Sequence, residues 1–185
     1  PLIEQFIFSE VMGYHRGAGV DPLGVNVLAP TLLVSGNHEQ KREHVPPTGR
    51  GERFWCQCWS EPNAGSDLAS LTTRAVRQGD DYIVNGQKIW TTGAHRADWC
   101  NLLARTNPDE KRSRGLSFFL LDMKTPGITV RPLINICGVH SFNEVFCDDI
   151  RVPKECLVEE QNQGWFYLLA ALDLERLMVG IGGFK

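Results

Sequence analysis

Residues 53 to 153 constrain the fold most, because short β-forming runs alternate there with turn signals and no helical periodicity lies between them. The expected strands are residues 54–60, 72–78, 82–84, 88–92, 99–105, 116–122, 128–132 and 144–152. Gly79-Asp80 and Asn85-Gly86 are among the turns expected between them. Strands this short and closely spaced predict an antiparallel sandwich or barrel.

The residues on both sides of this region have helical spacing. Apolar side chains three and four residues apart predict a helix over residues 4–16, and a mostly apolar run predicts a buried helix over 25–34. Asn37 is expected to cap a short helix, residues 38–44, which Val45-Pro46-Pro47 ends. Helical spacing returns at residues 165–184. We therefore expect an α+β multidomain chain divided into residues 1–52 (helical), 53–157 (β-domain) and 158–185 (helical).

The composition excludes several classes of function. The net charge is −3, so the 185-residue chain has no basic footprint for nucleic acid. Apolar runs are interrupted well before the roughly 18 residues of a membrane span, and no basic segment followed by an apolar one marks a signal peptide. We expect a cytoplasmic protein. The first residue is not Met and the last residues stop inside a helical pattern, which indicates a fragment.

Six cysteines raise the question of disulfides or a metal site, and they lie at positions 56, 58, 100, 137, 147 and 156. Cys56 and Cys58 lack the two-residue gap of zinc knuckles, and no Cys/His pair completes a site. We expect these two side chains to point to opposite faces of a strand. All six are expected to be reduced thiols, and no metal is expected.

Residues 55–67 combine a strand with a polar turn. Glu61-Pro62 ends the strand, and Gly65 can take positive φ in the turn that follows. Ser66, Asp67 and the turn amides could then receive a phosphate or pyrophosphate. A tight β-turn with a local side-chain cap would use the same residues, so the residues alone leave both interpretations open.

Three segments resemble the acyl-CoA dehydrogenase family: Cys-Gln-Cys-Trp-Ser-Glu-Pro-Asn-Ala-Gly-Ser-Asp (56–67), Asn-Gly-Gln-Lys-Ile-Trp-Thr-Thr-Gly (85–93) and Leu-Asp-Leu-Glu-Arg (172–176). The resemblance implies a flavoprotein oxidoreductase with FAD that desaturates an acyl-CoA thioester in fatty acid β-oxidation. A glutamate takes the α-proton and flavin N5 takes the β-hydride. The family has a helical domain, a middle β-domain and a C-terminal helical bundle. This chain would hold the end of the first, the whole second and the first helix of the third.

The resemblance also implies roles for individual residues. The implied flavin contacts are Gln57, Cys58, Trp59, Ser60, Gly65, Ser66, Trp90, Thr91 and Thr92. Trp90 would lie against the ring, and Thr92 would follow it on the same strand face. Many members have Tyr or Phe where this chain has Gln57, and Thr where it has Ser60.

On the substrate side, Glu175 is the candidate base, unless it is a surface or paired glutamate and a later part of the protein supplies the base. Asp173 and Arg176 would face the thioester and pantetheine, and Ser66 would approach the thioester. Ser113 and Arg114 would meet the CoA nucleotide, although a basic loop is usually only solvated.

The implied partners are the acyl-CoA substrate and an electron-transfer flavoprotein. Family members are usually homotetramers whose flavin sites borrow residues from a neighbouring subunit. The chain on its own is therefore expected to bind FAD poorly and to be inactive. Two alternatives stay open: a non-catalytic subunit of a heteromeric dehydrogenase, and an acyl-CoA oxidase.

Overall fold

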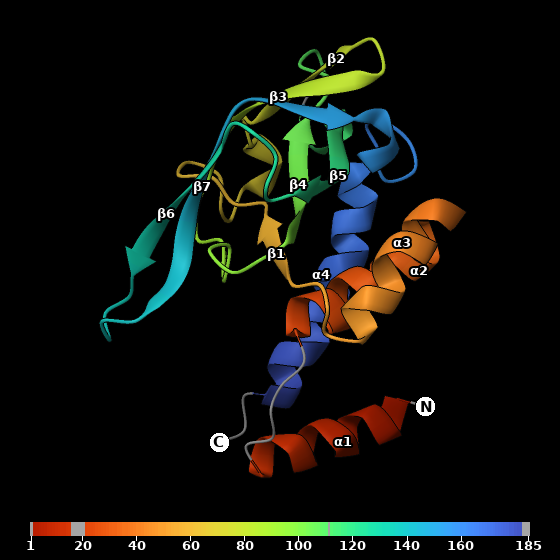
Figure 1. Cartoon of the computed structure of the whole chain (residues 1–185), viewed down its shortest axis with the longest axis vertical. Helices are drawn as coiled ribbons and strands as arrows, with labels where there is room; N and C mark the ends of the chain where they lie inside the picture. The colour runs from red at the N-terminus through yellow and green to blue at the C-terminus, as the bar shows by residue number, and fades with distance from the viewer. Residues whose placement is uncertain (1, 16–20, 111, 183–185) are drawn as a thin grey trace.

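The computed structural model describes residues 2–15, 21–110 and 112–182, although some side chains in the first and last helices lie outside the described set. The elements are α1 (Leu2–Tyr14), a π-helical turn (Gly24–Leu28), α2 (Ala29–Ser35), α3 (His38–Gly49), β1 (Trp55–Cys58), β2 (Arg74–Gln78), β3 (Asp81–Lys88), β4 (Trp99–Arg105), β5 (Leu116–Asp122), β6 (Ile128–Ile134), β7 (His140–Pro153) and α4 (Gly164–Gly182). Helices α2, α3 and α4 lie together beside the sheet, and the β6–β7 hairpin extends away from them (Figure 1). None of the described helices has the length and apolar character needed to cross a membrane.

The seven strands form one curled sheet in the order β1-β4-β2-β3-β7-β6, with β5 also paired to β4. Most pairs are antiparallel, as predicted, but β1 runs parallel to β4 from Trp55↔Trp99 to Cys58↔Leu102. A second parallel bridge joins β2 to β4 at Arg74↔Arg105. The expectation of a wholly antiparallel sheet is therefore wrong. The β2–β3 hairpin lies between β1 and β4 in the sequence, so β4 can return in the direction of β1.

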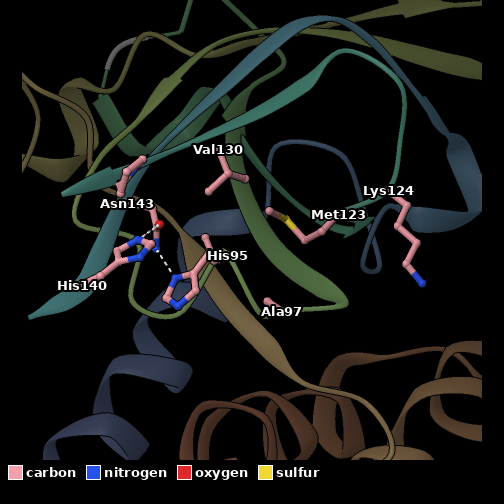
Figure 2. A pocket seen from close by; sticks show the side chains of 9 residues that line it. His95, Ala97, Met123, Lys124, Val130, His140 and Asn143 are labelled. Carbon is pink, nitrogen blue, oxygen red and sulfur yellow. Dashed lines mark hydrogen bonds between the residues drawn. The ribbon is translucent and has the colours of Figure 1, made fainter. Parts of the chain in front are cut away.

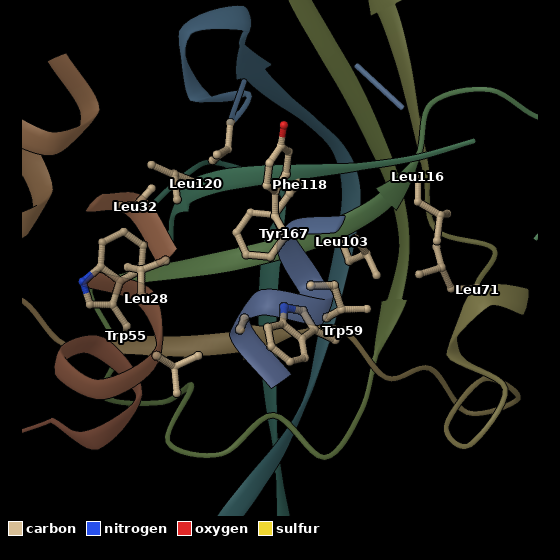
Figure 3. Close-up of a cluster of buried hydrophobic side chains, with 14 of the residues drawn as sticks. Leu28, Leu32, Trp55, Trp59, Leu71, Leu103, Leu116, Phe118, Leu120 and Tyr167 are labelled. Carbon is tan, nitrogen blue, oxygen red and sulfur yellow. The ribbon is translucent and has the colours of Figure 1, made fainter. Parts of the chain in front are cut away.

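Strands β1, β4 and β5 are covered on both faces, so the molecule has two apolar cores. The first core lies between these strands and helices α2 and α4 (Figure 3), and includes Leu28, Leu32, Trp55, Trp59, Leu103, Leu116, Phe118, Leu120, Tyr167 and Leu168. The second lies inside the curl of the sheet, and includes Cys56, Cys58, Tyr82, Val84, Cys100, Leu102, Phe119, Val145 and Ile150. Successive residues of β1 thus enter different cores, as the two-residue period of a strand requires.

The cysteines of β1 correct one expectation. Cys56 and Cys58 point to the same face, because residues two apart in a strand share a face. Their sulfur atoms and that of Cys100 all lie within 4.8 Å of one another in the interior core. The three thiols are free and buried, so the spacing rule that excluded a cysteine cluster was incomplete.

The N-terminal helices also differ from the sequence expectation. Asn37 caps α3 as predicted, since its side chain accepts from Gln40 N at 2.8 Å. The helix then continues through Pro46 and Pro47 to Gly49. Proline at position 47 leaves the carbonyl of Glu43 without its helical donor. The guanidinium of Arg53 donates to this carbonyl at 3.2 Å instead.

The apolar run 25–34 is less buried than expected. It is divided into the π-helical turn and α2, and Leu33 and Val34 are exposed. The division of the chain near residues 52 and 157 stays a prediction.

The expected turn at Asn85-Gly86 is absent. Strand β3 runs through it, with a register shift against β7 between Val84 and Gly86. A Cβ on Gly86 would lie 2.4 Å from Thr73 Oγ1, so close approach explains this glycine. The expected strand 88–92 is also wrong beyond Lys88, because Trp90 has φ 61°.

Candidate functional site

A cavity of about 400 Å³ lies where β1, the turn after it, the segment after β3 and helix α4 meet. Its lining residues are Leu23, Gln57, Trp59, Ser60, Gly65, Ser66, Leu68, Ile89, Trp90, Thr92, Trp165, Leu172 and Glu175. This volume is in the range of small-molecule sites in proteins. Residues from four segments that are far apart in the sequence therefore line one cavity.

The turn after β1 is closed by its own backbone. Glu61 N donates to Ala64 O at 2.9 Å, and Ala64 N donates back to Glu61 O at 3.0 Å. Gly65 follows with nothing within 4 Å of an added Cβ, and its φ is not positive. Gly65 therefore contributes open space for a ligand, and it does not contribute a left-handed backbone turn. The backbone of Gly65 and Ser66 is thus available to a ligand in the cavity.

A buried ion pair fixes this turn to β3. Lys88 is fully buried, and its Nζ donates to Glu61 Oε1 at 2.9 Å and to Trp59 O at 3.0 Å. Thr72 and Thr73 donate their backbone N–H groups to the same carboxylate. Burial alone would raise the pKa of Glu61, but Lys88 and these hydrogen bonds lower it to about 2. The two predicted flavin segments are therefore joined by a charged, hydrogen-bonded contact.

The segment after β3 leaves the sheet and turns toward the cavity. Ile89 N donates to Ser60 O at 2.9 Å, which is a second link between the two segments. Trp90 is 60% exposed, and its ring meets that of Phe142 edge-on at 6.1 Å. The prediction that Trp90 and Thr92 share a strand face is wrong, since this segment is not a strand. Both residues nevertheless line the cavity.

Helix α4 closes the cavity from the other side. A Cβ on Gly164 would lie 2.6 Å from the carbonyl carbon of Ser117, so glycine lets the helix begin directly on β5. Glu175 is half-buried on the cavity wall, and burial raises its pKa. A carboxylate whose pKa is raised by burial is a stronger base than a solvated one, so Glu175 is suited to accepting a proton from a ligand in the cavity.

Other predicted site residues lie elsewhere. The side chains of Cys58 and Thr91 are buried and are not among the lining residues. Ser113 and Arg114 lie on a 3₁₀ turn, Arg112–Gly115, away from the lining. Asp173 is exposed. The side chain of Arg176 lies outside the described residues.

The cavity also contains residues that the sequence did not single out. These are Leu23, Leu68, Ile89, Trp165 and Leu172. The spacing of Trp165, Leu172 and Glu175, at seven and then three residues, places them on one helix face and could have indicated it. Gln57 Nε2 and Trp59 Nε1 are buried without a hydrogen-bond partner among the described residues.

Comparison with known proteins assigns the family. The sequence pattern of "Acyl-CoA dehydrogenase, middle domain" matches residues 56–150. The chain belongs to the acyl-CoA dehydrogenase family. Acyl-CoA dehydrogenase FadE34 of Mycobacterium tuberculosis (strain ATCC 25618 / H37Rv) is 50% identical over 154 residues, which are 83% of this chain and 22% of the relative.

Solved structures of the family share the fold. The Tcur3481-Tcur3483 steroid ACAD is 33% identical with a TM-score of 0.91, and the match covers 97% of this chain and 46% of that one. A glutaryl-CoA dehydrogenase from Mycobacterium smegmatis in complex with FADH2 is 28% identical with a TM-score of 0.75, covering 85% of this chain and 39% of that one. The chain thus spans less than half the length of these proteins.

FAD is the cofactor of this family, and the cavity contains the groups that a flavin needs. Gln57 Nε2 and Trp59 Nε1 are donors with unused hydrogen-bonding capacity among the described residues. A buried donor without a partner is costly, and a flavin edge with several acceptor atoms would satisfy it. The open backbone at Gly65 suits a diphosphate.

Proposed function

We propose that this chain forms the flavin site of an FAD-dependent acyl-CoA dehydrogenase that introduces a double bond between the α and β carbons of an acyl-CoA thioester. One observation carries the proposal: residues of both flavin-like segments and Glu175 line the same cavity. The reaction needs these groups within reach of one substrate, since the proton and the hydride leave adjacent carbons.

Each group has a distinct task in this proposal. Gln57, Trp59 and Ser60 would hydrogen-bond the flavin ring edge, and Trp90 and Thr92 would contact the ring near N5. Gly65 and Ser66 would hold the pyrophosphate through backbone amides and a hydroxyl, with Ser66 also near the thioester. When bound, FAD supplies the acceptor for the β-hydride. These residues fix its orientation and tune its electronic properties.

Glu175 would remove the α-proton. Its half-buried carboxylate lies on the cavity wall, and the raised pKa increases its strength as a base. Because the deprotonated form is the base, turnover should rise with pH through this raised pKa. Asp173 and Arg176 on the same helix, and Ser113 and Arg114 on their 3₁₀ turn, are proposed for the CoA side on the resemblance alone.

Partners are proposed in the same way. The electrons would pass to an electron-transfer flavoprotein, and the protein would assemble as a homotetramer or a heteromer. The name of the related Tcur3481-Tcur3483 steroid ACAD pairs two proteins. A non-catalytic subunit of such a heteromer is therefore the second candidate. An acyl-CoA oxidase differs only in its acceptor, and oxygen consumption without the flavoprotein would identify it.

The test uses the intact protein that carries this chain, with Glu175→Gln and, as a control, Glu110→Gln in an exposed loop. Turnover of an acyl-CoA panel with a dye acceptor should fall about 100-fold or more in Glu175→Gln, since general-base catalysis contributes that much. Bound FAD, followed by its absorbance, should be unchanged, and Glu110→Gln should behave as wild type.

Two outcomes contradict the proposal. Full turnover in Glu175→Gln would place the base elsewhere in the protein. A wild-type protein that copurifies without flavin and shows no turnover would favour the non-catalytic subunit.

A further inference from the structure

Asn143 of β7 lies directly behind the segment that carries Trp90 and Thr92. It is fully buried. Its main-chain oxygen accepts from Thr91 N at 3.0 Å, and its Nδ2 donates to Thr91 O at 3.0 Å. One residue therefore satisfies both backbone groups of Thr91, as a neighbouring strand would. The side chain of Asn143 thus supplies the bond to Thr91 O that a main-chain N–H would supply in a regular strand pair.

The side-chain amide of Asn143 also contacts two histidines. His140 Nε2 lies 2.7 Å from Asn143 Oδ1, and His95 Nδ1 lies 3.3 Å from Nδ2 (Figure 2). The carbonyl of Thr91 can only accept, so Nδ2 must face it and Oδ1 must face His140. His140 then donates from Nε2, and His95 accepts at Nδ1. The two imidazoles stack at 3.9 Å with 25° between their planes, which holds both in place.

We call the two bonds between Asn143 and Thr91 the clamp. They hold Thr91 next to Trp90, whose backbone conformation is unfavourable. Trp90 has φ 61°, a left-handed conformation that residues with a Cβ rarely adopt. Such a residue persists only where its surroundings over-determine it. Thr91 is buried and held by Asn143, and Gly93 N donates to Ser141 O at 3.0 Å on the same strand. The residues on either side of Thr91, Trp90 and Thr92, line the cavity.

We propose that Asn143 is a positioning residue of the flavin site: it clamps Thr91 so that the Trp90 indole and the Thr92 hydroxyl face the cofactor. This inference rests on the proposed function, because it assigns a ligand to the cavity. Asn143 is not among the residues that line the flavin cavity. Its effect is transmitted through the backbone of one residue.

The test compares Asn143→Leu with Asn143→Asp in the intact protein. Leucine has similar size and removes every amide bond, whereas aspartate keeps an acceptor for His140 and loses the donor to Thr91 O. Both variants should shift the flavin absorption bands and midpoint potential, and Asn143→Leu should lower kcat about tenfold or more, since small misplacements of catalytic groups are costly. KM should change less than kcat.

Asn85→Ala is the matched control. Asn85 also joins β3 to β7 with two bonds, donating to Asp149 Oδ1 at 2.8 Å and accepting from Asp149 N at 2.9 Å, beside a positive φ of 46°. It is not among the cavity residues. This variant should lower thermal stability and leave the flavin spectrum, potential and kcat unchanged.

The outcomes separate this inference from the proposed function. Wild-type spectrum, potential and kcat in Asn143→Leu would overturn the positioning role, as would equal shifts in Asn85→Ala. Amide hydrogen exchange at Thr91 and Gly93 reports on the clamp with or without flavin. Exchange in Asn143→Leu should be at least tenfold faster than in wild type, and an unchanged rate would overturn the clamp. A wild-type protein without flavin would instead contradict the proposed function.

Discussion

Both faces of β1 are largely buried, but they differ in whether their polar side-chain atoms have hydrogen-bond partners. Trp55, Gln57 and Trp59 face the helices, and the last two line a cavity where buried donors lack partners among the described residues. Cys56 and Cys58 face the closed interior core. Both sets are largely shielded from solvent, although Gln57 is only half-buried and Trp59 lies one residue beyond the strand. A ligand-binding site on this strand is thus distinguished from the apolar core by buried donors without partners beside a cavity, and less by the extent of burial.

The largest effect is expected from breaking the buried ion pair between Lys88 and Glu61, which joins the turn after β1 to β3. Lys88→Met leaves the Glu61 carboxylate buried without its cation, so the free energy of unfolding should fall by about 3–5 kcal/mol. Urea denaturation measures this change. The double variant Lys88→Met/Glu61→Gln should lose less than the sum of the two single variants. A Lys88→Met protein as stable as wild type would contradict the assignment.

A smaller effect is expected from pH on the helix-facing side. His44 packs edge-on against Trp55 and Trp99, and burial together with Arg53 lowers its pKa to about 4. Because an unfolded histidine titrates near 6.5, the unfolded state binds more protons between those values. The stabilising contribution is complete above about pH 6.5 and is lost as pH falls toward 4, roughly 2 kcal/mol of it by pH 5.

Unfolding free energies at pH 7 and pH 5 test this dependence, with His44→Gln as the reference that does not titrate. The difference between the two pH values should be larger in wild type than in His44→Gln. Equal differences in the two proteins would show that another group is responsible.

The smallest effects distinguish the two faces of β1 directly. Cys56→Ala removes a sulfur from the closed core and should lower the free energy of unfolding by about 1 kcal/mol. Gln57→Leu removes an amide whose nitrogen has no partner in the described structure, so stability should change by less than about 0.5 kcal/mol.

FAD titration of the intact protein should show the reverse order. Gln57→Leu should weaken binding about tenfold, the value of one hydrogen bond of about 1.4 kcal/mol, and Cys56→Ala should leave it unchanged. Weaker binding in Cys56→Ala than in Gln57→Leu would refute the distinction between the faces.

Local patterns predicted the elements that depend on local forces. The bounds of β4 and β5 match the predicted strands, because both are mostly apolar runs between turns. The cap at Asn37 was also predicted, since a capping box needs only residues three apart. Predictions based on glycine and proline were less accurate. Gly86 does not form a turn but allows β3 to pass close to Thr73. Pro46 and Pro47 do not end the helix, and the carbonyl of Glu43 that loses its helical donor accepts from Arg53 instead.

Several residues that line the cavity were named from the sequence, but the geometry of the cavity was not predictable. Resemblance named Trp90, Thr92 and Glu175, and all three line the cavity. Nothing local to the sequence indicates that Trp90 leaves the strand at positive φ, because Asn143, which holds the neighbouring Thr91, lies more than fifty positions later. The partners of Lys88 are likewise distant in sequence. A buried lysine or asparagine needs a hydrogen-bond partner, but the sequence does not indicate which residue that partner is.

The parallel pairing of β1 with β4 has a consequence for how the chain reaches this fold. The hairpins β2–β3, β4–β5 and β6–β7 join neighbouring strands and need only short loop closures. Strand β1 pairs with β4 across a long connection that contains the β2–β3 hairpin and the Trp90 segment, so this pairing needs a larger loop closure than any of the hairpins. We therefore expect β1, which carries part of the cavity wall, to join the sheet after the hairpins have formed.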